Sequence, residues 1–243
     1  MIERAPHRAV HSAAPPRHVA IIMDGNRRWA TDRGLPSAEG HRRGGEVLHE
    51  ICAASGELGI EHLTVYAFSE ENWSREAAEV GVLMELVRWF ARKEVRALRR
   101  NNVRVHLLGR TDRLPPATGA ALDELVRGTA RCTGLQLNLA LNYGSRTELC
   151  DAVRALAIDV ARGALQASAV DESTISQYLY TAGMPDPDLL LRTGGELRLS
   201  NFLLYQVAYT ELWSTRTYWP DFTKGAYLEA LAEFAARQRR FGR

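Results

Sequence analysis

Side chains that could bind a phosphate group follow three short apolar runs of the sequence. The first of these segments, residues 24–29, reads DGNRRW and places a carboxylate beside a glycine turn and two arginines. Arginine presents a bidentate fork to phosphate oxygens, and a carboxylate can hold Mg²⁺ against the same oxygens. Free backbone N–H groups at the start of a following helix would suit the same anion. The segment fits a phosphate site, and it fits equally a capped turn whose arginines are solvated.

Two further polar segments have a similar composition. Residues 69–75 read SEENWSR, and residues 192–201 read RTGGELRLSN, with two arginines, two glycines and a serine in one loop. Acidic residues in the first of them could instead begin a helix, since carboxylates favour its positive end. Neither segment has the spacing of a Walker loop or of GxGxxG. Three such segments together favour the binding of two phosphorylated substrates side by side over three coincidences.

The segments between these polar loops alternate between strand and helix patterns. Apolar runs typical of buried strands cover residues 18–23, 62–68, 103–108, 135–141 and 188–192. Apolar residues spaced three or four apart predict helices over residues 45–58, 79–99, 117–130 and 147–162. This alternation predicts an α/β fold with a central parallel sheet and helices on both faces. Ligands bind such sheets beyond the carboxyl ends of the strands, which is where the three polar loops lie.

The composition restricts the class of protein. The chain has 243 residues, and we expect residues 1–17 to be a flexible leader and residues 18–243 to form a single domain. Lysine and arginine exceed aspartate and glutamate by 31 − 29 = 2, too small a surplus for a nucleic-acid-binding protein. The three cysteines form no CxxC pair, and no apolar run approaches the roughly 20 residues that cross a bilayer. These features predict a cytoplasmic localisation.

The motifs, in their order along the chain, resemble those of the cis-prenyltransferase family, in particular the bacterial undecaprenyl diphosphate synthases, or isoprenyl transferases. The resemblance runs from about residue 18 to residue 242. It rests on residues 18–26 (HVAIIMDGN), 66–69 (YAFS), 71–73 (ENW), 141–144 (LNYG), 192–196 (RTGGE), 200–204 (SNFLL) and 219–222 (WPDF). By this resemblance the single domain is catalytic. It would condense isopentenyl diphosphate with an allylic diphosphate, farnesyl or geranyl diphosphate by the resemblance, and release a Z-polyprenyl diphosphate of undecaprenyl or shorter length.

The resemblance also assigns roles to individual residues. Asp24 and Asn72 match catalytic residues, and Asp24 and Glu211 match carboxylates that bind Mg²⁺, the expected cofactor. The matching substrate-binding residues are Gly25, Asn26, Arg27, Arg28, Trp29, His41, Ser69, Glu70, Glu71, Trp73, Arg75, Arg192, Arg198, Leu199 and Ser200. The tail at residues 239–242 resembles a segment that reaches a partner subunit, which implies a homodimer. A basic segment from Arg92 to Arg104 is most simply a solvated face, with transient membrane contact during product release as a second interpretation.

Chemistry refines two of these assignments. An amide is a poor base, so we expect Asn72 to position a diphosphate oxygen or a water rather than to remove a proton. The chain has no DDxxD motif, which disfavours the helical trans-prenyltransferases.

Val80, Leu83 and Met84 share one helical face, and in the family the matching helix walls a tunnel for the growing chain. We expect this tunnel to pass Ala67, which lies at the end of the predicted strand over residues 62–68, and to run toward Leu135.

Two other functions remain open at this point. A non-catalytic partner subunit would generally lose the aspartate of DGN and some phosphate-binding arginines, whereas this chain keeps Asp24 and Arg192. A generic nucleotide-binding α/β protein would show a phosphate loop of known spacing. The chain also departs from the family at Ser37, where an arginine is common, at Arg27, where glycine is common, and at Leu197, where some members have histidine.

Overall fold

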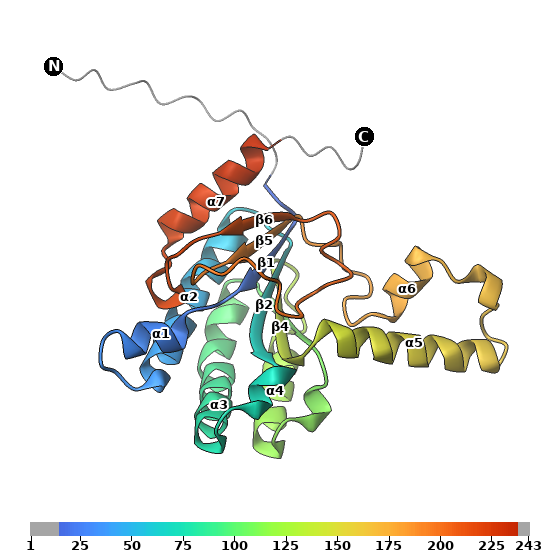
Figure 1. Ribbon diagram of the computed structural model, residues 1–243, viewed down its shortest axis with the longest axis horizontal. Helices are drawn as coiled ribbons and strands as arrows, with labels where there is room; N and C mark the ends of the chain where they lie inside the picture. Colours follow the sequence, from blue (N-terminus) through green and yellow to red (C-terminus); the bar gives the residue numbers. More distant parts are fainter. Residues whose placement is uncertain (1–14, 238–243) are drawn as a thin grey trace.

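Six parallel strands form one sheet in the order β3-β4-β2-β1-β5-β6 (Figure 1). The structure is a computed structural model and describes residues 15–237. The strands are β1 (His18–Ile22), β2 (His62–Ser69), β3 (Arg104–Leu108), β4 (Gln136–Tyr143), β5 (Leu189–Arg192) and β6 (Glu211–Ser214). β1 pairs with β2 on one side and with β5 on the other. The crevice beyond the carboxyl end of β1 is therefore flanked by loops from both halves of the sheet.

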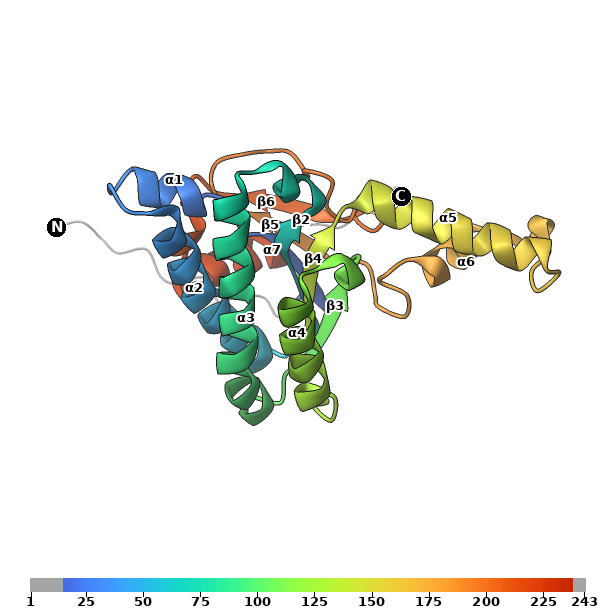
Figure 2. The same ribbon diagram turned by 90° about the horizontal axis from the view of Figure 1, so that it is seen from below.

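Helices connect the strands and pack mainly against one face of the sheet. They are α1 (Asn26–Thr31), α2 (Ser37–Glu57), α3 (Ala77–Arg100), α4 (Pro116–Thr129), α5 (Ser145–Ala161), α6 (Glu172–Tyr178) and α7 (Lys224–Ala236). Figure 2 shows α2, α3 and α4 side by side in front of the sheet. Each of these three helices follows a strand and leads to the start of another. They therefore run from the carboxyl ends of the strands toward the opposite edge.

The sheet separates two apolar cores. On the first face Val19, Ile21 and Leu63 pack with buried side chains of α2, α3, α4 and α7. On the second face the strand residues pack against Phe202 and Leu203, which belong to a segment without regular secondary structure. Helices α5 and α6 extend outward from this side (Figures 1 and 2). The continuous burial of β1 follows from this double cover, because a parallel strand with both faces covered can be apolar throughout.

The predicted α/β fold with a parallel sheet is confirmed, and each of the five predicted strands is present. β6 and α7 were not predicted, and α2 begins at Ser37 rather than at residue 45. Most of the predicted leader lies outside the described residues. Its last residue, Arg17, is bound to the sheet end: its backbone N–H donates to Asp188 over 2.8 Å, and its side chain pairs with Glu61 at 2.8 Å. Within residues 15–237, no helix has the length and apolarity to span a membrane.

Candidate active site

The carboxylate of Asp24 lies just beyond the carboxyl end of β1 and accepts hydrogen bonds from two arginines. Arg192, at the end of the adjacent strand β5, donates from Nη2 to Oδ2 over 2.7 Å. Arg28, one turn into α1, donates from Nη2 to Oδ1 over 3.2 Å. The pairing of β1 with β5 brings Asp24 and Arg192 together although 168 residues separate them in the chain. Two of the three predicted phosphate loops are therefore joined through one ion-pair cluster.

The loop after β5 also holds the backbone of Asp24. The hydroxyl of Thr193 accepts from the Asp24 N–H over 3.0 Å and donates to the Asp24 carbonyl oxygen over 2.8 Å. Gly194 has a φ of +83°, and a Cβ added there would lie 2.7 Å from Nη2 of Arg28. Only glycine combines this left-handed backbone with so close an approach to a neighbouring side chain. The glycine at position 194 thus leaves room for the Arg28 guanidinium beside Asp24.

The turn between β1 and α1 depends on Gly25. Its φ is +103°, and a Cβ there would lie 2.6 Å from Cδ1 of Tyr218. Asn26 follows and donates from Nδ2 to the Met23 carbonyl oxygen over 3.0 Å, while its own Oδ1 is buried without a hydrogen-bond partner in the described residues. The DGN motif is therefore a tight turn that points Asp24 outward from the sheet edge.

The loop after β2 is held by its own side chains. Ser69 and Asn72 form a capping box, in which the Asn72 Oδ1 accepts from the Ser69 N–H over 3.1 Å. This bond uses one of the two lone pairs of the amide oxygen and fixes the plane of the amide, and the Nδ2 donor of Asn72 forms no hydrogen bond within residues 15–237. Glu71 accepts from the amide of Asn201 over 2.8 Å, which ties this loop to the loop after β5. A neutral amide is a poor base, so the fixed Asn72 side chain can orient a ligand by hydrogen bonding rather than remove a proton.

A cavity of about 450 Å³, here called the first cavity, opens at Asp24 and extends between the sheet and helices α2, α3 and α4. Its mouth carries the polar side chains of Asp24, Asn26, Arg27, Arg28, His41, Asn72 and Arg75. Its inner part is lined by Leu48, Phe68, Leu83, Leu86, Val87, Phe90, Leu122, Leu139 and Leu141. A charged mouth on an apolar tunnel suits a ligand with an anionic head and a hydrocarbon tail.

A second cavity of about 500 Å³ lies on the other side of Asp24. It is lined by Ile22, Met23, Asp24, Tyr66, Ser69, Glu71, Asn72, Arg192, Ser200 and Asn201. Within this set Arg192 is 5% exposed and donates from Nη1 to the Ser200 hydroxyl over 2.9 Å. Asp24 and Asn72 line both cavities. Two ligands bound in the two cavities would therefore meet at the same pair of side chains.

His41 and Arg75 also line the first cavity. Burial, and next the positive charge of Arg75, lower the pKa of His41 to about 4, so the imidazole is neutral at pH 7. Its Nε2 is buried and has no partner within the described residues. Glu79 pairs with Arg75 at 2.9 Å and with Arg27 at 4.0 Å. The mouth therefore offers one neutral imidazole beside arginines that pair with Glu79.

Several predicted residues lie outside both cavities. Trp29 donates from Nε1 to Asp221 over 2.7 Å and stacks with Arg33, so its ring is held away from the mouth. Trp73 packs edge-on against Phe68 and donates to Asn142. Glu70 accepts from the hydroxyl of Thr147. These side chains hold the loops in place, and nothing in the geometry brings them to a ligand.

The loop after β5 contains two further predicted residues, Arg198 and Leu199, that line neither cavity. The Arg198 side chain points outward, with 63% of its surface exposed, and pairs with Glu196 at 2.5 Å, while its carbonyl oxygen accepts from Arg192. Leu199 packs against the second apolar core. Arg198 thus contacts the lining of the second cavity through its backbone bond to Arg192, while its guanidinium is paired with Glu196 at the surface.

Glu211 is not brought to Asp24 within this chain. In the register of the sheet Glu211 lies beside Leu189, at the start of β5, whereas Arg192 lies at its end beside Ser214. The Glu211 carboxylate accepts instead from Arg237 over 2.9 Å. The two predicted magnesium carboxylates, Asp24 and Glu211, therefore lie at opposite edges of the sheet in this chain, because β6 runs parallel to β5 and begins at the edge opposite Asp24.

The residues present fit a metal that binds mainly to substrate phosphates. No cluster of three acidic, histidine or cysteine side chains suited to a metal occurs among residues 15–237. Mg²⁺ commonly uses one or two protein carboxylates together with phosphate oxygens and waters, so a single carboxylate at the mouth of a phosphate pocket is sufficient. Asp24 is the carboxylate that both cavities share.

Two functional side chains were missed in the sequence. Thr193 positions Asp24, and Tyr66 lines both cavities while its hydroxyl donates to the Tyr143 carbonyl oxygen over 3.1 Å. Thr193 directly follows an assigned arginine and Tyr66 lies within the YAFS motif, so their positions beside strand ends were the available signal. Of the predicted tunnel wall, Ala67 and Leu83 line the first cavity, whereas Val80, Met84 and Leu135 are buried in the core beside it.

Comparison with known proteins agrees with this geometry. The family model described as "Putative undecaprenyl diphosphate synthase" matches residues 22–242. The isoprenyl transferase of Geobacillus kaustophilus is 52% identical over 93% of this chain and 88% of its own, and that of Brucella abortus is 51% identical over 93% and 89%. Lavandulyl diphosphate synthase from Lavandula x intermedia, solved in complex with dimethylallyl diphosphate, superposes with a TM-score of 0.92 at 37% identity, covering 95% of this chain and 99% of that one.

A probable undecaprenyl diphosphate synthase from Campylobacter jejuni superposes with a TM-score of 0.78 at 31% identity, covering 94% of this chain and 99% of that one. The family match covers all three strand-end loops that converge on Asp24. The chain belongs to the undecaprenyl diphosphate synthase family and is a prenyltransferase.

Proposed function

We propose that this prenyltransferase condenses isopentenyl diphosphate with an allylic diphosphate in a magnesium-dependent reaction and releases a Z-polyprenyl diphosphate. The observation that carries the proposal is the meeting of two cavities at Asp24 and Asn72. One cavity continues into an apolar tunnel, which suits the allylic substrate and its growing tail. The other has a buried arginine and no tunnel, which suits the small isopentenyl group.

The arginines and Asp24 supply the electrostatic part of the reaction. An allylic C–O bond breaks readily only if the leaving diphosphate is neutralised, and Arg27 and Arg28 lie at the mouth of the first cavity for this purpose. Mg²⁺ held by Asp24 would act as a Lewis acid on the diphosphate oxygens. Arg192 and Ser200 hold the diphosphate of isopentenyl diphosphate in the second cavity, where Asn72 donates from Nδ2. Adjacent sites place the double bond close to the allylic carbon and exclude water from it.

A second copy of this chain is the proposed partner. β6 pairs only with β5, so its outer edge is free of strand partners within residues 15–237. Leu212 on that strand is 52% exposed and Tyr209 just before it is 73% exposed. An exposed strand edge with apolar side chains commonly marks an interface. The tail at residues 239–242, which resembles a partner-reaching segment, lies outside the described residues.

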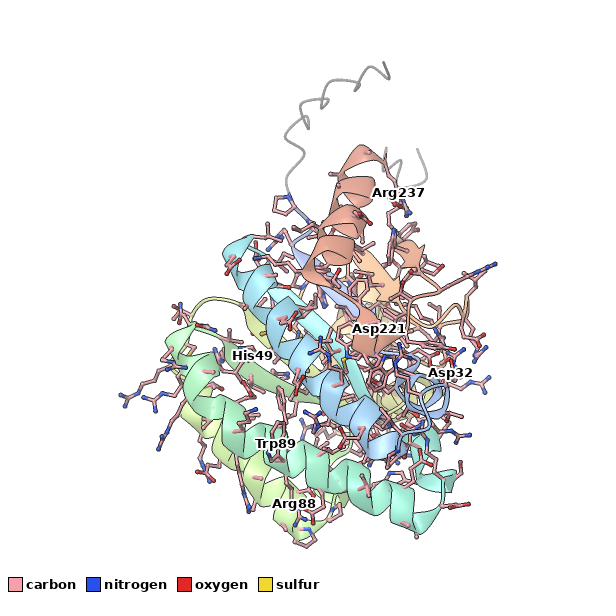
Figure 3. The ribbon with its side chains drawn as sticks, turned by 90° about the vertical axis from the view of Figure 1, so that its left-hand side faces the viewer. Asp32, His49, Arg88, Trp89, Asp221 and Arg237 are labelled. Atoms are coloured by element: carbon pink, nitrogen blue, oxygen red, sulfur yellow. The ribbon has the colours of Figure 1, made fainter. Side chains whose placement is uncertain are left out.

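A bilayer is the proposed destination of the product. The exposed cations of α3 are Arg92, Lys93, Arg96, Arg99 and Arg100, and none of them forms an ion pair within residues 15–237. Trp89 is 41% exposed and lies under the ammonium of Lys93, 4.3 Å from ring to nitrogen (Figure 3). Basic side chains beside an exposed tryptophan suit the surface of an anionic membrane. This surface is called the α3 basic face below.

The reaction itself tests the proposal. The protein is incubated with labelled isopentenyl diphosphate and, in separate assays, dimethylallyl, geranyl or farnesyl diphosphate, with Mg²⁺ or with a chelator. Chromatography sizes the products, and NMR assigns the geometry of the new double bonds. We expect elongation only with metal, new bonds of Z geometry, and undecaprenyl diphosphate or a shorter homologue as the main product. Products of E geometry, or equal elongation in the chelator, would contradict the proposal.

A further inference from the structure

The first cavity ends at a layer formed by one residue from each of three helices. Leu48 of α2, Phe90 of α3 and Leu122 of α4 line its inner end. Because the three helices run away from the mouth, residues one turn further along them lie beneath this layer. Those residues are Cys52, Glu94 and Leu125, and none of them lines the cavity. They form the floor on which the tail of a bound substrate would stop.

This floor layer is apolar except at Glu94. Cys52 and Leu125 belong to the buried core, with exposures of 3% and 0%, whereas Glu94 is a carboxylate that is only 7% exposed. The negative charge of Glu94 adds to burial in raising the pKa of the Cys52 thiol to about 12, which indicates that the two side chains are close. A buried carboxylate lowers stability unless it is well paired, so Glu94 needs a partner in this apolar layer.

His49 supplies the partner. Its Nδ1 lies 2.7 Å from Oε2 of Glu94, and its ring is 42% exposed on the outer side of α2. Figure 3 looks onto α2 and α3, with His49 labelled where the two helices lie side by side. No other side chain within residues 15–237 bonds to Glu94. The pair joins the two helices beneath the cavity and closes the space between them with a polar contact.

We propose that Glu94, held by His49, forms a polar floor that stops the growing prenyl tail and determines the length of the product. A tail that has reached Leu48 and Phe90 can advance by another isoprene only by packing against the carboxylate or by parting it from His49. Hydrocarbon offers neither a hydrogen bond nor a counter-charge, so the next condensation stalls. Glu94 touches no reacting atom and is a specificity-determining residue. The inference rests on the proposed prenyl elongation.

Replacement of the carboxylate tests the polar floor. Glu94→Leu has an apolar side chain of similar size, and we expect its main product to be longer than that of the wild type by at least one isoprene unit. The Michaelis constants and turnover of the first condensation should stay as in the wild type, because the floor is not reached at that stage. Glu94→Gln keeps a hydrogen bond to His49 without the charge, and a smaller shift toward longer products is expected.

Glu85→Leu is the matched control. Glu85 lies on the same helix, its side chain is 68% exposed, and it pairs with Arg88 at the surface away from the cavity. The products of the Glu85→Leu enzyme should have the same length distribution as those of the wild type. If both Glu94 variants fold, as judged by their melting curves, and give the wild-type or a shorter distribution, the polar floor is wrong and the pair only joins two helices. If the wild type makes no elongated product, the proposed function itself fails instead.

Discussion

Arg192 donates a hydrogen bond of 2.7 Å to Asp24, and the arginine is almost fully buried while the carboxylate faces two cavities. The bond joins the ends of β5 and β1. It holds one oxygen of Asp24 toward the second cavity, and Arg28 holds the other toward α1. A single carboxylate is thereby fixed between the two proposed diphosphate sites, which is the arrangement that two adjacent phosphorylated substrates require.

Substitution of Arg192 and substitution of Arg198 should have different effects on the enzyme. We expect Arg198→Ala to raise the Michaelis constant for isopentenyl diphosphate roughly tenfold, because an exposed guanidinium worth about 1.5 kcal/mol to a phosphate is lost. The melting temperature should not change. Arg192→Ala should raise the same constant further and also destabilise the fold, since the Asp24 carboxylate loses the nearer of its two arginine partners. Steady-state kinetics with each substrate varied in turn, together with thermal melts, measure both effects.

The assignment of the second cavity depends on the contrast between substrates. Neither variant should alter the Michaelis constant for the allylic diphosphate as strongly. Arg113→Ala serves as the control, because Arg113 lies in a surface turn and lines neither cavity. Equal increases for both substrates would show that the arginines do not belong to one site.

Ala67→Leu should shorten the product. Ala67 lines the first cavity near its mouth, where the register of β2 and β4 is irregular, and a leucine there would occupy the path of the tail. Each isoprene buries five more carbons at roughly 0.8 kcal/mol per CH₂, so elongation continues until a clash outweighs this gain. Chromatography of the products measures the length distribution.

Ala78→Leu is the control for Ala67. Ala78 is exposed at the start of α3 and lines neither cavity, so the same substitution should leave product length unchanged. An Ala67→Leu enzyme with the wild-type distribution would mean that the tail takes another route.

His41 should make stability depend on pH. Its pKa is about 4 in the folded protein and 6.5 in the reference state, so between these values the unfolded chain binds more protons. The free energy of unfolding is therefore highest above pH 6.5, where the imidazole is neutral in both states. It falls by up to roughly 3 kcal/mol as the pH drops toward 4. Urea unfolding of the wild type and of His41→Asn at pH 7.5 and pH 4.5 separates this effect from other groups. Equal losses in the two proteins would show that His41 is not buried as a neutral group.

The α3 basic face should bind anionic vesicles. We expect the double variant Arg96→Glu, Arg99→Glu to bind vesicles that contain phosphatidylglycerol much more weakly than the wild type, since each cation contributes about 1 kcal/mol near such a surface. Raised salt should weaken wild-type binding in the same way, and pure phosphatidylcholine vesicles should bind neither protein. Arg154→Glu, on the projecting helix α5, is the matched control. Unchanged binding of the double variant would leave α3 as a solvated face.

The sequence predicted the central fold because β1, β2 and β4 are short runs of mainly apolar residues that the fold buries almost throughout. β6 escaped prediction for the opposite reason. It has four residues, alternates between half-buried and exposed positions, and lies at the sheet edge, so it carries no apolar run. The first turns of α2 contain Gly40 and Gly44, which pack closely on Asn26 and Trp219, and these small residues hid the helical pattern.

The candidate site was predictable in its residue types but not in its contacts. The motif order implied that Asp24, Asn72 and Arg192 belong together, and the parallel sheet brings them to one edge. No sequence pattern indicated that Trp29 would bond to Asp221, because that pairing joins residues 192 positions apart. The position of Glu211 depends on the register of a strand that was itself not foreseen.

Turnover of Asp24→Asn tests the central claim most directly. The amide keeps an acceptor for Arg192 but removes the negative charge, and we expect kcat to fall by roughly 10²-fold or more in saturating Mg²⁺. The melting temperature should stay close to that of the wild type. Asp221→Asn, outside both cavities, is the control and should keep wild-type turnover. A folded Asp24→Asn enzyme that condenses isopentenyl diphosphate at the wild-type rate would contradict a reaction centred on this carboxylate.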